Sequence, residues 1–354
     1  MSEQQTRLTS YAQCPSCGAV MTFEPKSNSL GCAYCGSKRP LDKTRFARRH
    51  EYGEETETGF VPWGEVNHFR CAACGAVCAL PDYEMSPECP FCNSANLIAE
   101  SEIKGLKPTG VLPFRIDKTD AEAKYGEFIK KKVFAPSALR KNFKVNAMKG
   151  IYIPTFSFTS DTVSEYSGVM GKYYYVTVGS GKNRRTERRI RYFPVSGVLN
   201  KSFEDMQYEV SSHLTQKDLR KIGFFDVENA LEYDKDYFAG FSCERYTESL
   251  DATWERAKGD MYDVIRAAII SRHNADVVSS LSINTRYANR RYQYLLAPVW
   301  KCSYKFKEKL YDFFINGRTG KSDGQAPVSA AKVSLLVFGV LCVLAVIIYF
   351  FLSR

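Results

Sequence analysis

The sequence predicts an α+β protein with two tandem N-terminal zinc ribbons, a mixed antiparallel sheet domain with helices, and one C-terminal transmembrane helix. Three observations lead to this prediction. Eight cysteines fall in four CxxC pairs, runs rich in Tyr, Val and Phe alternate with helical segments in the middle of the chain, and an uncharged apolar run lies near its end. With 354 residues, 44% of them hydrophobic, the chain is large enough to bury a substantial core.

The cysteine pairs form an internal repeat. In each copy two CxxC motifs are separated by fourteen residues, and the second copy begins 57 residues after the first. Each CxxC makes a tight turn that points two thiolates at one centre, so each copy predicts one structural Zn²⁺ held by four thiolates. The expected ligands are Cys14, Cys17, Cys32 and Cys35 in the first ribbon, and Cys71, Cys74, Cys89 and Cys92 in the second.

Three alternatives compete with two independent structural zinc sites. Disulfides require an oxidising compartment, and the N-terminal stretch MSEQQTRLTSYAQ lacks the apolar run of a secretory signal, so we expect reduced thiols in the cytosol. A catalytic zinc needs an open coordination position, which four thiolates do not leave. A cross-braced arrangement, in which Cys14 and Cys17 share a zinc ion with the second repeat, stays open.

Composition divides the chain into six segments. Prolines and glycines between residues 105 and 118 break any helix and mark the start of the largest segment. The linker between the ribbons holds a basic stretch followed by an acidic one, and we expect it to be helical in part. The segments are a flexible N-terminus at 1–13, zinc ribbon 1 at 14–37, a linker at 38–70, zinc ribbon 2 at 71–98, an α+β body domain at 105–323 and a transmembrane helix at 333–352.

Within the body domain, helical and strand-like patterns alternate. Residues 117–133 predict a helix with acids early and lysines late, as the helix dipole prefers, and residues 251–272 predict a second helix from their apolar periodicity. Strands are predicted where alternating runs are rich in β-branched and aromatic residues. These runs are 150–158, 172–178 and 188–195, and then a closing antiparallel set at 275–287, 292–305 and 309–315.

The C-terminal apolar run predicts a membrane anchor. Residues 333–352 contain no charge and no proline, and a helix of this length is about 30 Å long, the thickness of a bilayer's hydrocarbon core. A buried core helix would instead show a polar stripe at helical spacing. Lys321 and Lys332 precede the run and favour a cytosolic body, so we expect a tail-anchored, single-pass protein of the cell membrane.

Charge is unevenly distributed along the chain. Residues 1–104 hold 10 Lys and Arg against 13 Asp and Glu, whereas the remainder holds 39 against 26, which argues against nucleic acid as the partner of the ribbons. Residues 182–191 (KNRRTERRIR) form a basic cluster next to a Gly-Ser-Gly turn. We expect Lys182, Arg184 and Arg185 to bind an anionic surface, with nucleic-acid phosphates or a solvated hairpin tip as the alternatives.

Motifs for catalysis are missing from the sequence. The nearest approach to a phosphate-binding loop is GSGKN at residues 179–183, where valine stands in place of the first glycine at position 176 and Asn183 replaces the hydroxyl residue that would bind Mg²⁺. Nucleophile-elbow and HExxH motifs are also missing. We therefore expect a protein that is not an enzyme.

The order of several motifs resembles a known family. CPSCGA, CAYCG, WGE before FRCAACGA, CPFC, VLPF, FAPSALRK, GIYIPTFSF, FPVSG, YFAGF, LLAPVW and FFINGRTGK follow the pattern of bacterial TFIIB-type zinc-ribbon membrane proteins, often mislabelled helicase-like. The resemblance covers nearly all of residues 14–321. It implies no enzymatic activity, and it implies a place beside PspA-like and SPFH (flotillin-like) membrane-stress proteins.

These observations lead to one functional hypothesis and one alternative. The first is a membrane-anchored scaffold or adaptor that meets membrane lipids through its C-terminal helix and recruits PspA-type or SPFH-type partner proteins. The alternative is a nucleic-acid-binding zinc-ribbon protein tethered to the membrane. The acidic balance of residues 1–104 favours the first hypothesis.

Overall fold

The computed structural model confirms the α+β class and describes residues 13–41, 45–53, 68–79, 89–92, 94–100, 105–137, 148–306 and 309–352. A small three-stranded antiparallel sheet belongs to the first ribbon. Its strands are β1 (Thr22–Glu24), β2 (Ser29–Gly31) and β3 (Lys38–Pro40). Residues 1–12 of the expected flexible N-terminus lie outside the described part of the chain.

A 12-stranded sheet forms the rest of the β structure. Along it the strands follow the order β11-β8-β13-β9-β12-β6-β5-β7, while β10 pairs with β9, β4 and β14 pair with β13, and β15 pairs with β14. The short strands are β4 (His50–Glu51), β5 (His68–Cys71), β6 (Val77–Ala79), β7 (Leu97–Glu100), β8 (Gly110–Val111), β11 (Leu231–Glu232), β12 (Ser242–Glu244), β14 (Lys309–Asn316) and β15 (Ser322–Gly324).

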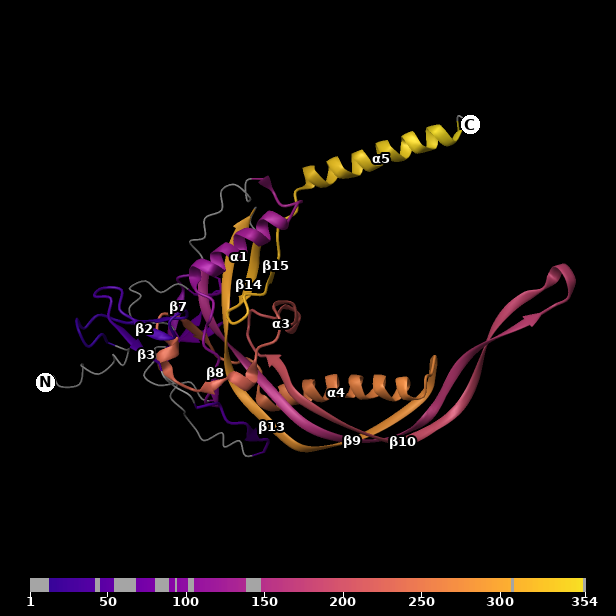
Figure 1. The fold of residues 1–354 in the computed structure, drawn as a ribbon, viewed down its shortest axis with the longest axis horizontal. Helices are drawn as coiled ribbons and strands as arrows, with labels where there is room; N and C mark the ends of the chain where they lie inside the picture. Colours follow the sequence, from indigo (N-terminus) through magenta and orange to yellow (C-terminus); the bar gives the residue numbers. More distant parts are fainter. Residues whose placement is uncertain are drawn as a thin grey trace.

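Three long strands form an arch on one side of the molecule (Figure 1). They are β9 (Met148–Val178), β10 (Arg185–Glu209) and β13 (Val277–Phe306). The sequence predicted shorter, separate strands here, and that prediction was wrong. The polar residues between the predicted runs continue the strands because their side chains form hydrogen bonds with neighbouring strands. The Ser164 hydroxyl bonds the Thr285 hydroxyl across 2.9 Å, and the Thr162 hydroxyl donates to the Lys201 carbonyl. Bulges near residues 203–206, 278–280 and 288–291 bend the strands without ending them.

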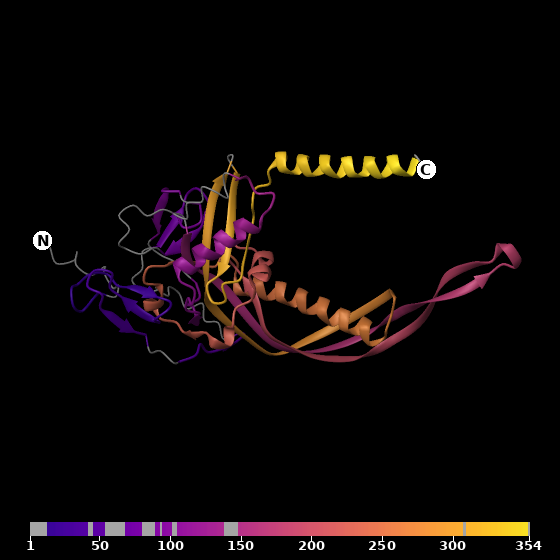
Figure 2. The ribbon, with the colours of Figure 1, turned by 45° about the horizontal axis from the view of Figure 1, so that its top comes forward.

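Helices cover parts of this sheet. α4 (Leu250–Arg272) lies along the concave side of the arch and buries Trp254, Met261 and Ile265 against it (Figures 1 and 2). α1 (Lys118–Lys131) is capped at its N-terminus by Asp117, whose side chain accepts from the Asp120 backbone N–H at 2.7 Å. Both helices confirm the predicted positions. The described residues also contain α3 (Gln216–Ile222) and α5 (Ala330–Leu352).

The expectation that the linker is helical in part falls largely on residues outside the described part of the chain. Within its described residues, 38–41, 45–53 and 68–70, the structure contains strands and no helix. The backbone of the linker forms hydrogen bonds with strands of the large sheet. β4 pairs with β13, and the Glu232 backbone N–H donates to the Arg45 carbonyl at 2.8 Å. Residues 54–67 of the linker lie outside the described part.

Candidate metal centres

The eight predicted cysteines come together as two groups of four. In each group the sulfur atoms lie within 4.8 Å of one another. The Sγ atoms of Cys14 and Cys35 are 3.4 Å apart, and those of Cys71 and Cys92 are 3.6 Å apart. A zinc ion with Zn–S bonds of about 2.3 Å needs sulfur atoms about 3.8 Å apart, so the two groups fit such an ion. Each group draws its cysteines from one repeat, unlike the cross-braced alternative, and all eight are free thiols in this structure.

Tight turns position the sulfur atoms. The Gly18 backbone N–H donates to the Cys14 carbonyl at 2.9 Å, and Gly75 makes the same bond to Cys71 at 2.8 Å. Both glycines have φ near +75°, a left-handed conformation that closes the turn and that larger residues adopt only with strain. The CxxC-Gly pattern therefore encodes the turn geometry locally.

Electrostatics favour a cation in each group. Burial raises the pKa of Cys14, but backbone N–H donors at Ser16 and Cys17 outweigh it and bring the pKa to about 6. At Cys71 burial is likewise outweighed by the backbone donors of Cys74 and Ala73, giving a pKa of about 7. The first cysteine of each group therefore ionises more readily than an ordinary thiol. A divalent cation would stabilise the remaining thiols in the same ionised form.

The first ribbon is fixed to the body by one aromatic residue and several ion pairs. The Phe23 ring packs edge-on against Tyr237 with 5.2 Å between ring centroids, and the Phe23 backbone N–H donates to the Ala239 carbonyl at 2.8 Å. At the rim, Arg39 pairs with Asp236 at 2.8 Å. The aromatic contact is buried, so it contributes more to the attachment than the exposed ion pair.

The second ribbon is part of the large sheet. Its strand β6 pairs with β12, where Cys78 lies opposite Glu244. The side chain of Phe91, in the last knuckle, is 2% exposed and stacks on His213 with ring centroids 4.4 Å apart. The buried ammonium of Lys301 donates to the Phe91 carbonyl at 2.9 Å. Sequence reasoning missed Lys301, although a lone lysine in the apolar run LLAPVWKC was a usable signal.

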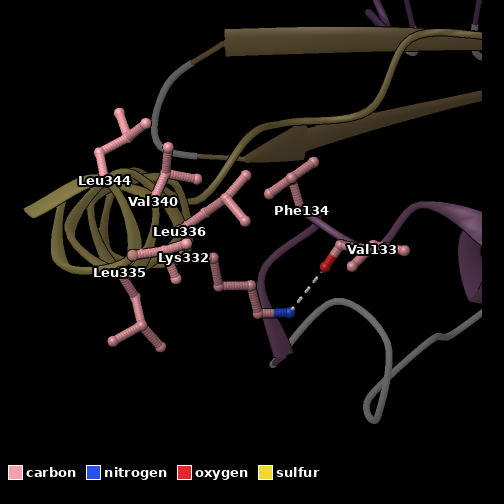
Figure 3. A pocket seen from close by; sticks show the side chains of 9 residues that line it. Val133, Phe134, Lys332, Leu335, Leu336, Val340 and Leu344 are labelled. Carbon is pink, nitrogen blue, oxygen red and sulfur yellow. Dashed lines mark hydrogen bonds between the residues drawn. The ribbon is translucent and has the colours of Figure 1, made fainter. Parts of the chain in front are cut away.

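The C-terminal helix α5 stands apart from the body's core. It is a 23-residue helix long and apolar enough to cross a membrane, and none of its residues is buried. At its first turn, Lys332 donates to the Ala135 and Val133 carbonyls at 2.7 and 3.2 Å. Figure 3 shows this lysine beside a groove of about 820 Å³ between α5 and the loop of Val133 and Phe134.

The predicted anionic-surface residues lie at the tip of the β9–β10 hairpin, far from both cysteine groups (Figure 1). Lys182 lies in the 3-10 turn Gly181–Asn183, and its side chain lies outside the described part. The Arg184 and Arg185 side chains are exposed, and Arg185 pairs with Glu187 at 2.8 Å. The structure therefore places the three residues at one end of the molecule.

Comparisons with known proteins add no activity. No family model matches the chain, and no solved structure matches it. It is similar to the uncharacterized protein YdjG of Bacillus subtilis (strain 168), with 26% identity over 339 residues that cover 94% of each chain. The two four-cysteine groups and the apolar helix α5 are compatible with a membrane-anchored zinc-binding protein.

Proposed function

We propose that the chain is a non-enzymatic, membrane-anchored zinc-ribbon adaptor with its body in the cytosol. The observation that carries the proposal is the closure of both cysteine groups. Four sulfurs complete each tetrahedron, so a zinc ion bound there shapes a surface and has no coordination position left for a substrate. The contacts of both ribbons with the body support a rigid platform, and α5 supplies the anchor.

The repeat itself points to a contact residue for the partner. Tyr34 in CAYC and Phe91 in CPFC occupy the same position of the second knuckle. Phe91 is 2% exposed because the body encloses it, whereas Tyr34 is 89% exposed. A bare aromatic ring on a rigid knuckle is the kind of anchor around which protein interfaces are built. We infer that Tyr34 binds a partner protein much as Phe91 binds the body.

The family resemblance supports the class of partner. Its members occur beside PspA-like and SPFH-type proteins, so we propose that the adaptor recruits such a protein in a membrane-stress assembly. The alternative function, a tethered nucleic-acid-binding protein, draws support from the exposed Arg188 and Arg189, which lie opposite Tyr175 and Tyr174 in the ladder. The excess of acidic residues in the first 104 positions opposes it for the ribbons.

The test uses the full chain in lipid nanodiscs, mixed with a purified PspA-like or SPFH-type protein from the same organism. We expect saturable binding that Tyr34→Ala weakens by about tenfold or more, the loss typical of a central aromatic anchor. Tyr34→Phe is the matched control and should retain most of the affinity, and metal analysis should return the same zinc content for both variants.

Duplex DNA and single-stranded RNA are measured in parallel. If neither the PspA-like nor the SPFH-type protein binds, and the full chain binds nucleic acid in a salt-dependent manner, the adaptor proposal is wrong and the alternative function holds.

A further inference from the structure

The loop that follows α1 is bonded to the first turn of α5. The Ser329 backbone N–H donates to the Phe134 carbonyl at 2.8 Å, and Lys332 donates to the carbonyls of Val133 and Ala135. The C-terminal end of α1 is accordingly the end nearer α5 (Figure 1). Because α5 is the candidate membrane span, these bonds hold the loop at the level where the chain would enter a bilayer.

The surface at this position combines cations with apolar side chains. We call residues 130–134 the junction loop, which comprises the last two residues of α1 and the three that follow. Its first three residues are exposed lysines: Lys130, Lys131 and Lys132. The next two are apolar, and Val133 is 67% exposed and Phe134 39% exposed. Side chains that lie at the boundary between lipid headgroups and acyl chains have this composition.

Helix geometry explains the lysines without explaining the apolar pair. Cations at the C-terminal end of a helix interact favourably with its dipole, and the Lys132 ammonium also lies 4.5 Å from the centroid of the Phe128 ring. Neither effect requires Val133 and Phe134 to be exposed. Val328, the residue before Ser329, is 64% exposed as well. Exposed apolar side chains therefore gather around the start of α5, which indicates contact with a medium other than water.

An apolar groove continues from the junction loop along α5. Val133 and Phe134 line it on one side, and Lys332, Leu336 and Val340 line it from α5 (Figure 3). The groove reaches Leu344, about 18 Å further along the helix than Lys332. It therefore runs from the charged beginning of α5 into the part of the helix that would cross hydrocarbon, where acyl chains suit its lining.

The charge of this region selects the occupant. Residues 130–144 hold six Lys and Arg and no Asp or Glu, and residues 324–354 hold no Asp or Glu either. An apolar protein helix would fill the groove but would bring no anions to the lysines. A nucleic acid would bring phosphates but no apolar chains. An anionic phospholipid bilayer supplies both, at the place where α5 enters it.

We propose that the junction loop docks into the headgroup layer of an anionic phospholipid bilayer beside α5. Val133 and Phe134 enter the boundary between headgroups and acyl chains, while Lys130 and Lys131 contact lipid phosphates. This proposal rests on the proposed membrane anchoring by α5. It adds a second membrane contact, so that the body is oriented with the C-terminal end of α1 toward the bilayer.

The experiment reconstitutes the full chain in vesicles of phosphatidylcholine with phosphatidylglycerol that contain nitroxide-labelled lipid as a quencher. Phe134→Trp places a fluorescent reporter in the junction loop, and Val133→Trp is a second reporter at a more exposed position. Ala123→Trp is the control, at an exposed position about two turns before the end of α1. The fluorescence of the parent chain, which has three tryptophans, is subtracted. We expect strong lipid quenching at positions 133 and 134 and weak quenching at 123.

A second set of variants tests the lysines. Lys130→Gln together with Lys131→Gln, added to the Phe134→Trp chain, should reduce the docked-to-undocked ratio about tenfold, because both cations lie near the anionic surface. Lys118→Gln together with Lys217→Gln is the matched control. It removes the same charge from exposed positions at the start of α1 and on α3, and should leave the quenching unchanged.

The outcomes separate docking from anchoring. A chain that carbonate extracts from the vesicles would overturn the anchoring and this proposal with it. An anchored chain whose positions 133 and 134 are quenched no more than position 123 would overturn the docking alone. Quenching at 134 that persists unchanged in pure phosphatidylcholine, or in the double lysine variant, would contradict an anionic surface. Quenching at 134 that falls as the ratio of protein to lipid rises would show that a second copy of the chain covers the groove in place of lipid.

Discussion

The buried ammonium group of Lys301 donates a hydrogen bond to the backbone carbonyl of Phe91. This contact joins the last zinc knuckle to strand β13. Asp312 lies 3.5 Å from the same ammonium and supports its charge. Burial lowers the pKa of Lys301, while Asp312 opposes that shift. Both ribbons share buried cores with the body, but the second ribbon joins the large sheet whereas the first keeps a small sheet of its own.

This difference predicts unequal effects of losing each zinc site. Cys17→Ser and Cys74→Ser alter the same position of the two repeats, and each should lower the zinc content of the purified full chain from two ions to one. Cys74→Ser should lower the thermal midpoint of the body more, because β6 is part of the large sheet. Metal analysis and calorimetry measure both effects. A parent chain that binds fewer than two zinc ions in reducing buffer would contradict the two-site prediction.

Replacing Lys301 should loosen the second ribbon. In Lys301→Met the Phe91 carbonyl and the Asp312 carboxylate both lose a buried donor, so we expect a loss of about 2 kcal/mol in the free energy of unfolding. Denaturant unfolding of the full chain measures it. Lys217→Met, an exposed lysine on α3, is the control and should change stability little. Equal stability of the two variants would show that the Lys301 contact is dispensable.

Stability should also depend on pH through Glu209. Burial raises the pKa of this carboxyl from 4.5 to about 8, against the opposing effect of Arg256. Between these values the folded chain holds a proton that the unfolded chain has lost, so this contribution to stability is full below about pH 4.5 and disappears as the pH rises through about 8.

Glu209→Gln should therefore gain stability relative to the parent chain on going from pH 6 to pH 8. The stability of the variant should depend less on pH in that window than the stability of the parent chain does. Denaturant midpoints at the two pH values measure the change, and the exposed Glu204→Gln on the same strand is the control. A parallel pH dependence in Glu209→Gln and the parent chain would contradict the assignment.

Truncation tests the anchor. Removing residues 333–354 should release the chain from membranes after a carbonate wash, because α5 is the described helix long and apolar enough to cross a bilayer. The body should keep its thermal transition, since α5 buries none of its residues. Fractionation and calorimetry measure these outcomes. A truncated chain that resists carbonate extraction would show that another segment holds it in the membrane.

Local patterns made the cysteine groups and two helices predictable. CxxC and the following glycine determine a turn within a few residues, the order of acids and lysines marks α1, and the 3.6-residue periodicity of α4 is visible within its own segment. Such features depend on neighbours along the chain. The eight cysteines were identified by spacing alone for the same reason.

Features that depend on distant partners were not predictable in the same way. β9 continues through polar residues because Thr162 and Ser164 form side-chain hydrogen bonds with β10 and β13. A short segment of the sequence does not reveal those partners. The placement of Phe91 also depends on Lys301, more than two hundred positions along the chain. The composition of the linker likewise does not reveal the pairing of its strand β4 with β13.

The pairing of β6 with β12 has a consequence for the order of events during synthesis. Cys78 leaves the ribosome long before Glu244, its partner in the β6–β12 ladder. The pairing of the second ribbon with β12 therefore forms only after more than half of the body has been synthesised. The sheet of the first ribbon is closed by residues 22–40 alone. A growing chain can therefore close the sheet of its first ribbon early, whereas the sheet of the second ribbon gains its pairing with β12 only after residue 244 has been synthesised.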